Sequence, residues 1–71
     1  MVIPLDALLF GIESARKSLI KMEYKTRRLF EIHGGNPPPA TVLEYTRIME
    51  VDASIKKSLE DKLHKLYPSY A

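Results

Sequence analysis

The chain has 71 residues, a formal net charge of +2 and no cysteine. A domain this short buries only about 60% of the surface that its unfolded chain exposes, and without cysteine it has neither disulfides nor thiolate metal sites. Because 45% of its residues are hydrophobic and 28% are charged, the chain is too apolar to be disordered. We therefore expect one folded domain that needs a partner to supplement a small core.

The beginning of the sequence shows no pattern of a membrane span or a secretion signal. The apolar stretch from Ile3 to Gly11 is interrupted by Pro4 and Asp6 and is much shorter than the roughly 20 residues that cross a bilayer. No basic residue precedes it, and no small-residue cleavage site follows it. These features predict a cytoplasmic protein without a membrane span.

A stretch of six residues, from Gly34 to Pro39, divides the sequence with two glycines, an asparagine and three prolines. Glycine accepts the left-handed conformation that closes a helix, whereas proline lacks an amide donor and cannot lie inside one. The long stretches on either side have no internal proline. The predicted fold is all-α, an antiparallel two-helix hairpin with helices over residues 4–33 and 41–67 and a turn over 34–40.

In the first predicted helix, apolar and small residues recur at alternating steps of three and four. They are Leu5, Leu8, Ile12, Ala15, Leu19, Met22, Thr26 and Leu29. This heptad spacing puts them on one face, which we expect to pack against the second helix. Pro4 and Asp6 suit a first helical turn, and Gly34 suits a left-handed cap at the other end.

The second predicted helix opens with a capping-box spacing, in which Thr41 and Glu44 can each bind a free amide. An apolar series follows at steps of three or four: Tyr45, Ile48, Val51, Ile55, Leu59, Leu63 and Leu66. Its repeated four-residue steps drift from a strict heptad and favour a straight helix over a long supercoil. The two series together predict a hairpin core of Leu8, Ile12, Leu19, Met22, Ile48, Ile55 and Leu59.

Several further apolar side chains fall beside or opposite these two series. A two-helix hairpin covers only one side of each helix, so the others must be exposed, self-associate or meet another protein. Aromatic residues are enriched in such interfaces. We predict a partner interface at Phe10, Tyr24, Phe30, Met49 and Tyr67, and a homo-oligomer remains open.

The sequence shows no pattern of catalytic or metal-binding residues. The two histidines have structural explanations, because His33 lies at a predicted helix end and His64 follows Glu60 by four residues. The prolines after Gly34 and Gly35 lack the amides that a phosphate would need. A two-helix hairpin also offers little concavity. We predict no enzymatic activity, no metal and no cofactor.

Basic residues cluster in the second half of the first helix, namely Arg16, Lys17, Lys21, Lys25, Arg27 and Arg28. Such a face can bind nucleic acid by releasing the counterions of the phosphates. The net charge is only +2, and Lys17, Lys21 and Arg28 point away from the predicted packed face. We therefore favour a solvated helix face and keep a small basic nucleic-acid-binding protein as an alternative.

Two segments resemble a known family. Residues 27–35 end the first helix in Gly-Gly, and residues 43–50 begin the second with Tyr45 near its start, continuing to Ala53, Ile55 and Leu59. A chain of about seventy residues with this layout resembles the small E-type co-chaperone of type III secretion systems, the partner of the needle-subunit chaperone. The triple proline departs from the pattern of that family.

The resemblance implies a non-enzymatic function. In that family the hairpin packs against a second chaperone built from tetratricopeptide-like helices and stabilises it, and the pair keeps the needle subunit monomeric in the cytoplasm before export. The alternative is a needle or inner-rod subunit, because a needle subunit is also a short hairpin with a turn such as Asn36-Pro37. We prefer the co-chaperone, because needle subunits have a glutamine-rich C-terminal helix and this chain has no glutamine.

Overall fold

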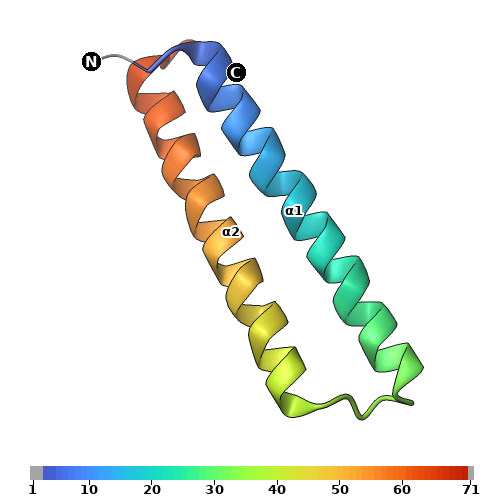
Figure 1. Ribbon diagram of the computed structural model, residues 1–71. Coiled ribbons are helices and arrows are strands. Elements are labelled where there is room, and N and C mark those ends of the chain that lie inside the picture. The colour runs from blue at the N-terminus through green and yellow to red at the C-terminus, as the bar shows by residue number, and fades with distance from the viewer. Residues whose placement is uncertain (1–2, 71) are drawn as a thin grey trace.

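The structure is a computed structural model that describes residues 3–70, and these form two helices joined by a short turn. Helix α1 (Leu5–Ile32) and helix α2 (Pro39–Leu66) each have 28 residues and run antiparallel, as Figure 1 shows. The all-α helical hairpin predicted from the sequence is therefore confirmed. Both ends of the described range lie at the open end of the hairpin, opposite the turn (Figure 1).

The hairpin is elongated, with principal extents of 48 × 17 × 15 Å. Its radius of gyration is 15.7 Å, whereas a compact domain of this length has one of about 11 Å. Each helix packs only against the other. Each therefore has a wide outer side that no other part of the described chain covers.

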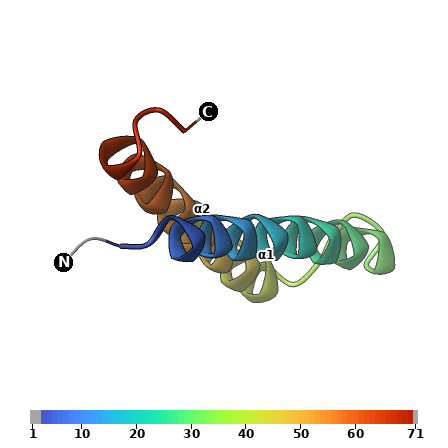
Figure 2. The same cartoon turned by 90° about the horizontal axis from the view of Figure 1, so that it is seen from above.

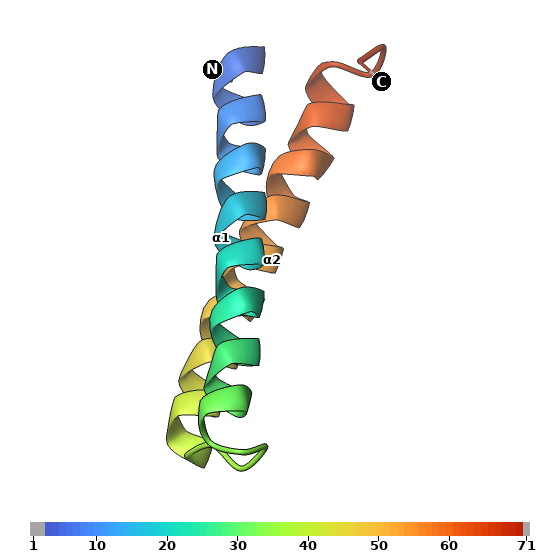
Figure 3. The ribbon, with the colours of Figure 1, turned by 90° about the vertical axis from the view of Figure 1, so that its right-hand side faces the viewer.

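The two helix axes are inclined to each other. Figure 3 shows α2 passing behind α1, from one side of it near the turn to the other side at the open end, and Figure 2 shows the same inclination from above. The register is nevertheless constant, because the residue numbers add to 70 in three separate contacts between the helices or their flanking segments. These contacts join Ile3 to Tyr67, Gly11 to Leu59 and Ser18 to Asp52.

The end of α1 has the left-handed cap that the sequence predicts. Gly34 and Gly35 have φ angles of 60° and 86°, which place both in the left-handed region. The Gly34 amide donates to the carbonyl of Glu31 at 3.2 Å, and the Gly35 amide donates to that of Phe30 at 2.7 Å. These two bonds satisfy carbonyls that the helix leaves free, and together they form a Schellman motif.

Helix α2 begins two residues before its predicted start, and the predicted capping box is wrong. Pro39 occupies the first helical turn, where its fixed φ and missing amide cost nothing. The carbonyl of Pro38 accepts the amides of Thr41 and Val42 at 3.1 and 3.2 Å, and no side chain caps the helix. Thr41 therefore lies inside α2, because the prolines fix the start of the helix upstream of it.

The face of α1 that packs against α2 follows the heptad series. All eight residues of the series are buried or half-buried, and Leu8 has no exposed surface. Ala15 and Met22 follow it at steps of seven and are also buried. Thr26 fits this face because its hydroxyl donates to the Met22 carbonyl at 2.8 Å, which leaves no unpaired polar group there.

The structure corrects the predicted face of α2. Ile48 and Ile55, which we assigned to the hairpin core, have exposed fractions of 38% and 46%, and Val51 is also exposed. Residues one position away take their place against α1. The observed packed face of α2, whose members are buried or half-buried, consists of Val42, Tyr45, Met49, Asp52, Lys56, Leu59 and Leu63.

The heptad spacing of α1 explains why Asp52 and Lys56, and not Ile48 and Ile55, face it. A face with steps of three and four can stay in contact only with a face of the same period, and the apolar series of α2 drifts away from that period. The observed face alternates three and four from Val42 to Leu59 but includes Asp52 and Lys56 at its centre. Both charges have partners, since Asp52 accepts a hydrogen bond from Ser18 and the Lys56 ammonium lies 3.3 Å from Glu60.

Candidate interaction surface

A row of exposed aliphatic side chains runs along one flank of α2, next to its packed face. We call this row the aliphatic stripe, and its members are Ile48, Val51, Ile55 and Leu66. Leu59, which is half-buried, completes the row between Ile55 and Leu66. Because these residues recur at steps of three, four or seven, their side chains share one side of the helix.

The aliphatic stripe lies on the side of the hairpin where α1 has small residues. Gly11 faces Leu59 so closely that an added Cβ would lie 2.7 Å from the Leu59 Cδ1 atom. Ser18 lies seven residues further along the same flank and contacts Asp52. Ala7 and Ser14, one turn from Gly11 in each direction, are exposed. The surface of α1 beside the stripe therefore has no long side chain over these three turns.

The residues of the predicted partner interface do not gather into one surface. Phe10 and Tyr24 have exposed fractions of 75% and 59%, but they lie 14 residues apart on α1, which is about 21 Å along the helix. Phe30 is exposed near the turn. Met49 and Tyr67 are half-buried, and the Tyr67 hydroxyl donates to the Ile3 carbonyl at 2.9 Å. These last two residues thus take part in holding the hairpin together.

The sequence pattern missed the aliphatic stripe because it assigned Ile48 and Ile55 to the interior. A signal that could have revealed it is the strict heptad that starts at Tyr45 and passes through Met49, Asp52 and Lys56. That heptad matches the spacing of α1 better than the apolar series does. A prediction based on this spacing, and not on hydrophobicity, would have placed Ile48 and Ile55 outside the packed face of α2.

The charged side chains of α1 form ion pairs along the helix and a cluster of cations on its outer side. The Arg16 guanidinium pairs with Glu13 at 2.8 Å and Arg28 with Glu31 at 3.5 Å, both along the exposed helix surface. The hydrogen bond from Arg16 lowers the pKa of the Glu13 carboxyl below its usual value, and the same bond raises the pKa of Arg16. Lys17, Lys21, Lys25 and Arg28, which are exposed, share the outer side of the helix by their spacing.

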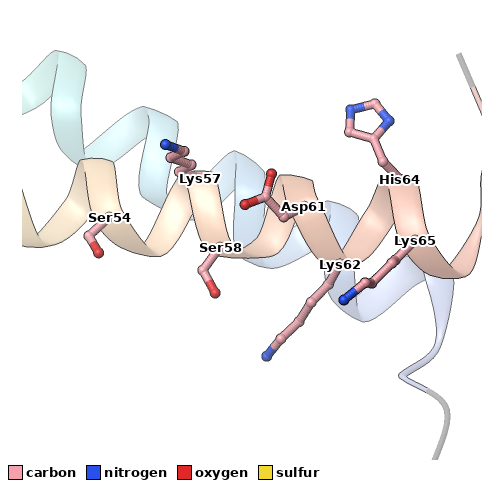
Figure 4. Close-up of a pocket in the computed structure, with 7 residues that line it drawn as sticks. All are labelled: Ser54, Lys57, Ser58, Asp61, Lys62, His64 and Lys65. Carbon is pink, nitrogen blue, oxygen red and sulfur yellow. The ribbon is translucent and has the colours of Figure 1, made fainter.

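The outer side of α2 has a shallow hollow lined by polar and charged residues, shown in Figure 4. The hydroxyls of Ser54 and Ser58 point to one side of the helix, and the carboxylate of Asp61 and the imidazole of His64 point to the other (Figure 4). A serine nucleophile needs a base within hydrogen-bond reach. In this hollow the serines and the two candidate bases therefore do not form such a pair.

Residues 3–70 do not form a metal site or a membrane span. That part of the chain contains no group of three or more histidine, cysteine, aspartate or glutamate residues placed to hold a metal ion. Neither α1 nor α2 has a stretch apolar enough to span a bilayer. His33 and His64 are both exposed.

Comparison with known proteins finds no match. No family model fits the sequence, and neither a curated protein nor a solved structure matches it at a significant level. The chemistry and shape of the surface therefore carry the functional argument. Among residues 3–70, eleven large apolar side chains are exposed, whereas four apolar residues are buried.

Proposed function

We propose that the chain is a non-enzymatic interaction protein, a co-chaperone of a type III secretion system that stabilises a needle-subunit chaperone through helix packing. One observation supports this proposal above all: eleven large apolar side chains among residues 3–70 are exposed on the outside of the hairpin. A surface of this kind is typical of a protein that is completed by a partner. In this role the protein acts in the cytoplasm, and the chaperone and the needle subunit are its partners.

The outer side of α1 is the proposed contact with the chaperone. Phe10 and Tyr24 lie there with Lys17 between them, at intervals of seven residues that align all three side chains along the helix. Aromatic residues that are rigid and exposed are the usual anchors of protein interfaces. Lys17 adds positive charge, so an acidic group is expected opposite it on the partner.

The test is co-expression with the tetratricopeptide-type needle chaperone and the needle subunit encoded in the same genome. We expect a stable ternary complex and a rise in the melting temperature of the hairpin, because binding to the folded state stabilises it. Changing both Phe10 and Tyr24 to aspartate should abolish the complex, whereas Ser54→Asp and Ser58→Asp on the outer side of α2 should not. Separate elution of the three wild-type proteins contradicts the proposal.

A second candidate function has a specific observation in its favour. The exposed cations Lys17, Lys21, Lys25 and Arg28 share one side of α1, as a nucleic-acid-binding helix requires. If they bind phosphates, affinity for duplex DNA or RNA falls steeply with salt and is lost when Lys17, Lys21 and Lys25 become glutamate. The absence of a mobility shift at low salt removes this candidate.

A further inference from the structure

We propose that a second copy of this chain docks on the aliphatic stripe and forms a symmetric four-helix bundle. The two-fold axis runs parallel to the hairpin, so that α2 of each copy lies over α1 of the other. This inference goes beyond the proposed function, because it concerns a different side of the hairpin. Three observations support it: the area of exposed surface, the shapes of the two flanks and the placement of charges.

The accessible surface area of the hairpin is larger than that of a compact monomer of the same mass. The accessible surface is 5476 Å² for a mass of 8.1 kDa, whereas a compact monomer of that mass has about 4,500 Å². The excess of about 1,000 Å² is close to the roughly 800 Å² that each partner contributes to a standard interface. Pairing along one flank would therefore bring the protein to the surface area of a compact domain.

The two flanks are complementary in shape. In the proposed arrangement each residue of α2 lies level with a residue of α1 in the other copy, and the numbers of these two residues add to 70. Ile55 then lies against Ser14 and Ser18 of the other copy, where α1 is narrow. Ile48 lies against the aliphatic stem of Lys21. The large Ile55 side chain on α2 thus meets small side chains on α1, as packing of ridges into grooves requires.

In a two-fold dimer every contact between the two copies occurs twice. A two-fold interface is self-complementary, since the flank that supplies the large residues must also offer the space that receives them. The inclination of α2 to α1 fits this pattern, because each helix stands out from the hairpin over only part of its length (Figures 2 and 3). The protruding part of one copy meets the recessed part of the other.

The charges near the turn are complementary as well. A hollow between the helices there is lined in part by Lys25, Arg28 and Leu29. In the proposed dimer Glu44 of the other copy lies level with Thr26 and thus reaches Lys25. Glu44 is exposed and has no ion pair with any other residue of the described range 3–70. The two-fold symmetry therefore gives the interface two such pairs of a cation and an anion, both at the turn end of the bundle.

The first experiment measures the mass of the purified chain by light scattering and sedimentation over a series of concentrations. The wild type is expected to be dimeric, and Ile55→Glu should raise the dimer dissociation constant by about tenfold or more, because it buries an unpaired charge. Ser54→Glu makes the same change in charge on the outer side and should leave the constant unchanged. A monomeric wild type, or equal effects of the two variants, overturns the proposal.

The second experiment tests the arrangement and uses the absence of native cysteine. Ser14→Cys and Ile55→Cys are prepared as separate proteins and treated with a short thiol-specific cross-linker, alone and as a mixture. The mixture is expected to give a covalent dimer faster than either variant alone, since only unlike positions lie together. Faster linkage of Ile55→Cys with itself means a different two-fold axis and overturns the proposed geometry.

A charge exchange provides a check that does not depend on apolar packing. Glu44→Lys or Lys25→Glu alone should weaken the dimer, and the two together should restore it, because the pair forms between copies. Failure of the double variant to recover contradicts the proposed contact. Failure here leaves the co-chaperone proposal untouched, since binding to the chaperone is measured with other partners and other variants.

Discussion

The Ser18 hydroxyl on α1 donates a hydrogen bond of 2.5 Å to the carboxylate of Asp52 on α2, across the middle of the hairpin. This contact places a charged residue in the packed face of α2, at a position where the heptad favours an apolar side chain. A half-buried carboxylate is stable there only while it has a hydrogen-bond donor. The pair therefore fixes how the two helices are aligned.

Removing the donor should destabilise the hairpin. We expect Ser18→Ala to lower the free energy of unfolding by about 1 kcal/mol, because the Asp52 carboxylate loses its partner. The double variant Ser18→Ala with Asp52→Leu should recover this loss or exceed the wild type, since an apolar pair suits the interior. Urea unfolding at fixed protein concentration measures both. Ser54→Ala, on the outer side of α2, is the control for helix propensity.

Gly11 should be sensitive to the size of its replacement. A Cβ at this position would lie 2.7 Å from the Leu59 Cδ1 atom, so any replacement displaces the Leu59 side chain, and a leucine adds a second large side chain to the same space. We expect Gly11→Leu to cost about 1 to 3 kcal/mol of unfolding free energy. Lys17→Leu, on the outer side of the same helix, should cost little. Equal stability of the two variants would show that the helices do not approach closely at Gly11.

The left-handed cap predicts a conformational effect without any steric contact. Gly34 has a φ of 60°, and nothing lies within 4 Å of the place that a Cβ would take. Gly34→Ala should therefore lose about 1 to 2 kcal/mol from backbone strain alone. Gly34→Asn should lose less, because asparagine tolerates this conformation. Thermal unfolding distinguishes the two, and equal melting temperatures contradict the explanation.

The hydrogen bond at the open end should control local rather than global stability. The Tyr67 hydroxyl donates to the Ile3 carbonyl at 2.9 Å, just before the first turn of α1 and just after the last turn of α2. Tyr67→Phe should cost about 0.5 to 1.5 kcal/mol and speed amide hydrogen exchange in the first turn of α1 and the last turn of α2. Exchange near Ser18 should not change. Tyr70→Phe provides the matched control, since no hydrogen bond joins the Tyr70 hydroxyl to another residue of the range 3–70.

Much of this hairpin could be predicted from the sequence, because local chemistry decides it. The heptad of α1 and the glycines after it are short-range signals, and both agree with the structure. The start of α2 was misplaced, because Thr41 suits a cap in isolation but the prolines before it already fix the helix. Local rules compete at such points, and the conformation of proline prevails.

The packed face of α2 could not be predicted in the same way, because it depends on both helices at once. Hydrophobicity alone favours Ile48 and Ile55, whereas the register with α1 selects Asp52 and Lys56. The hydrogen bond to Ser18 becomes visible only when the two helices are placed together. The exposed isoleucines, and with them the aliphatic stripe, follow from that register.

The pairing of Ile3 with Tyr67 has a practical consequence for engineering. Because both described ends lie together and far from the turn (Figure 1), a short glycine linker could join them and the chain could be opened at Asn36 instead. Such a circular permutant keeps every contact between the helices and changes only their connection. Comparing its refolding rate with that of the native order would reveal which end of the hairpin forms first.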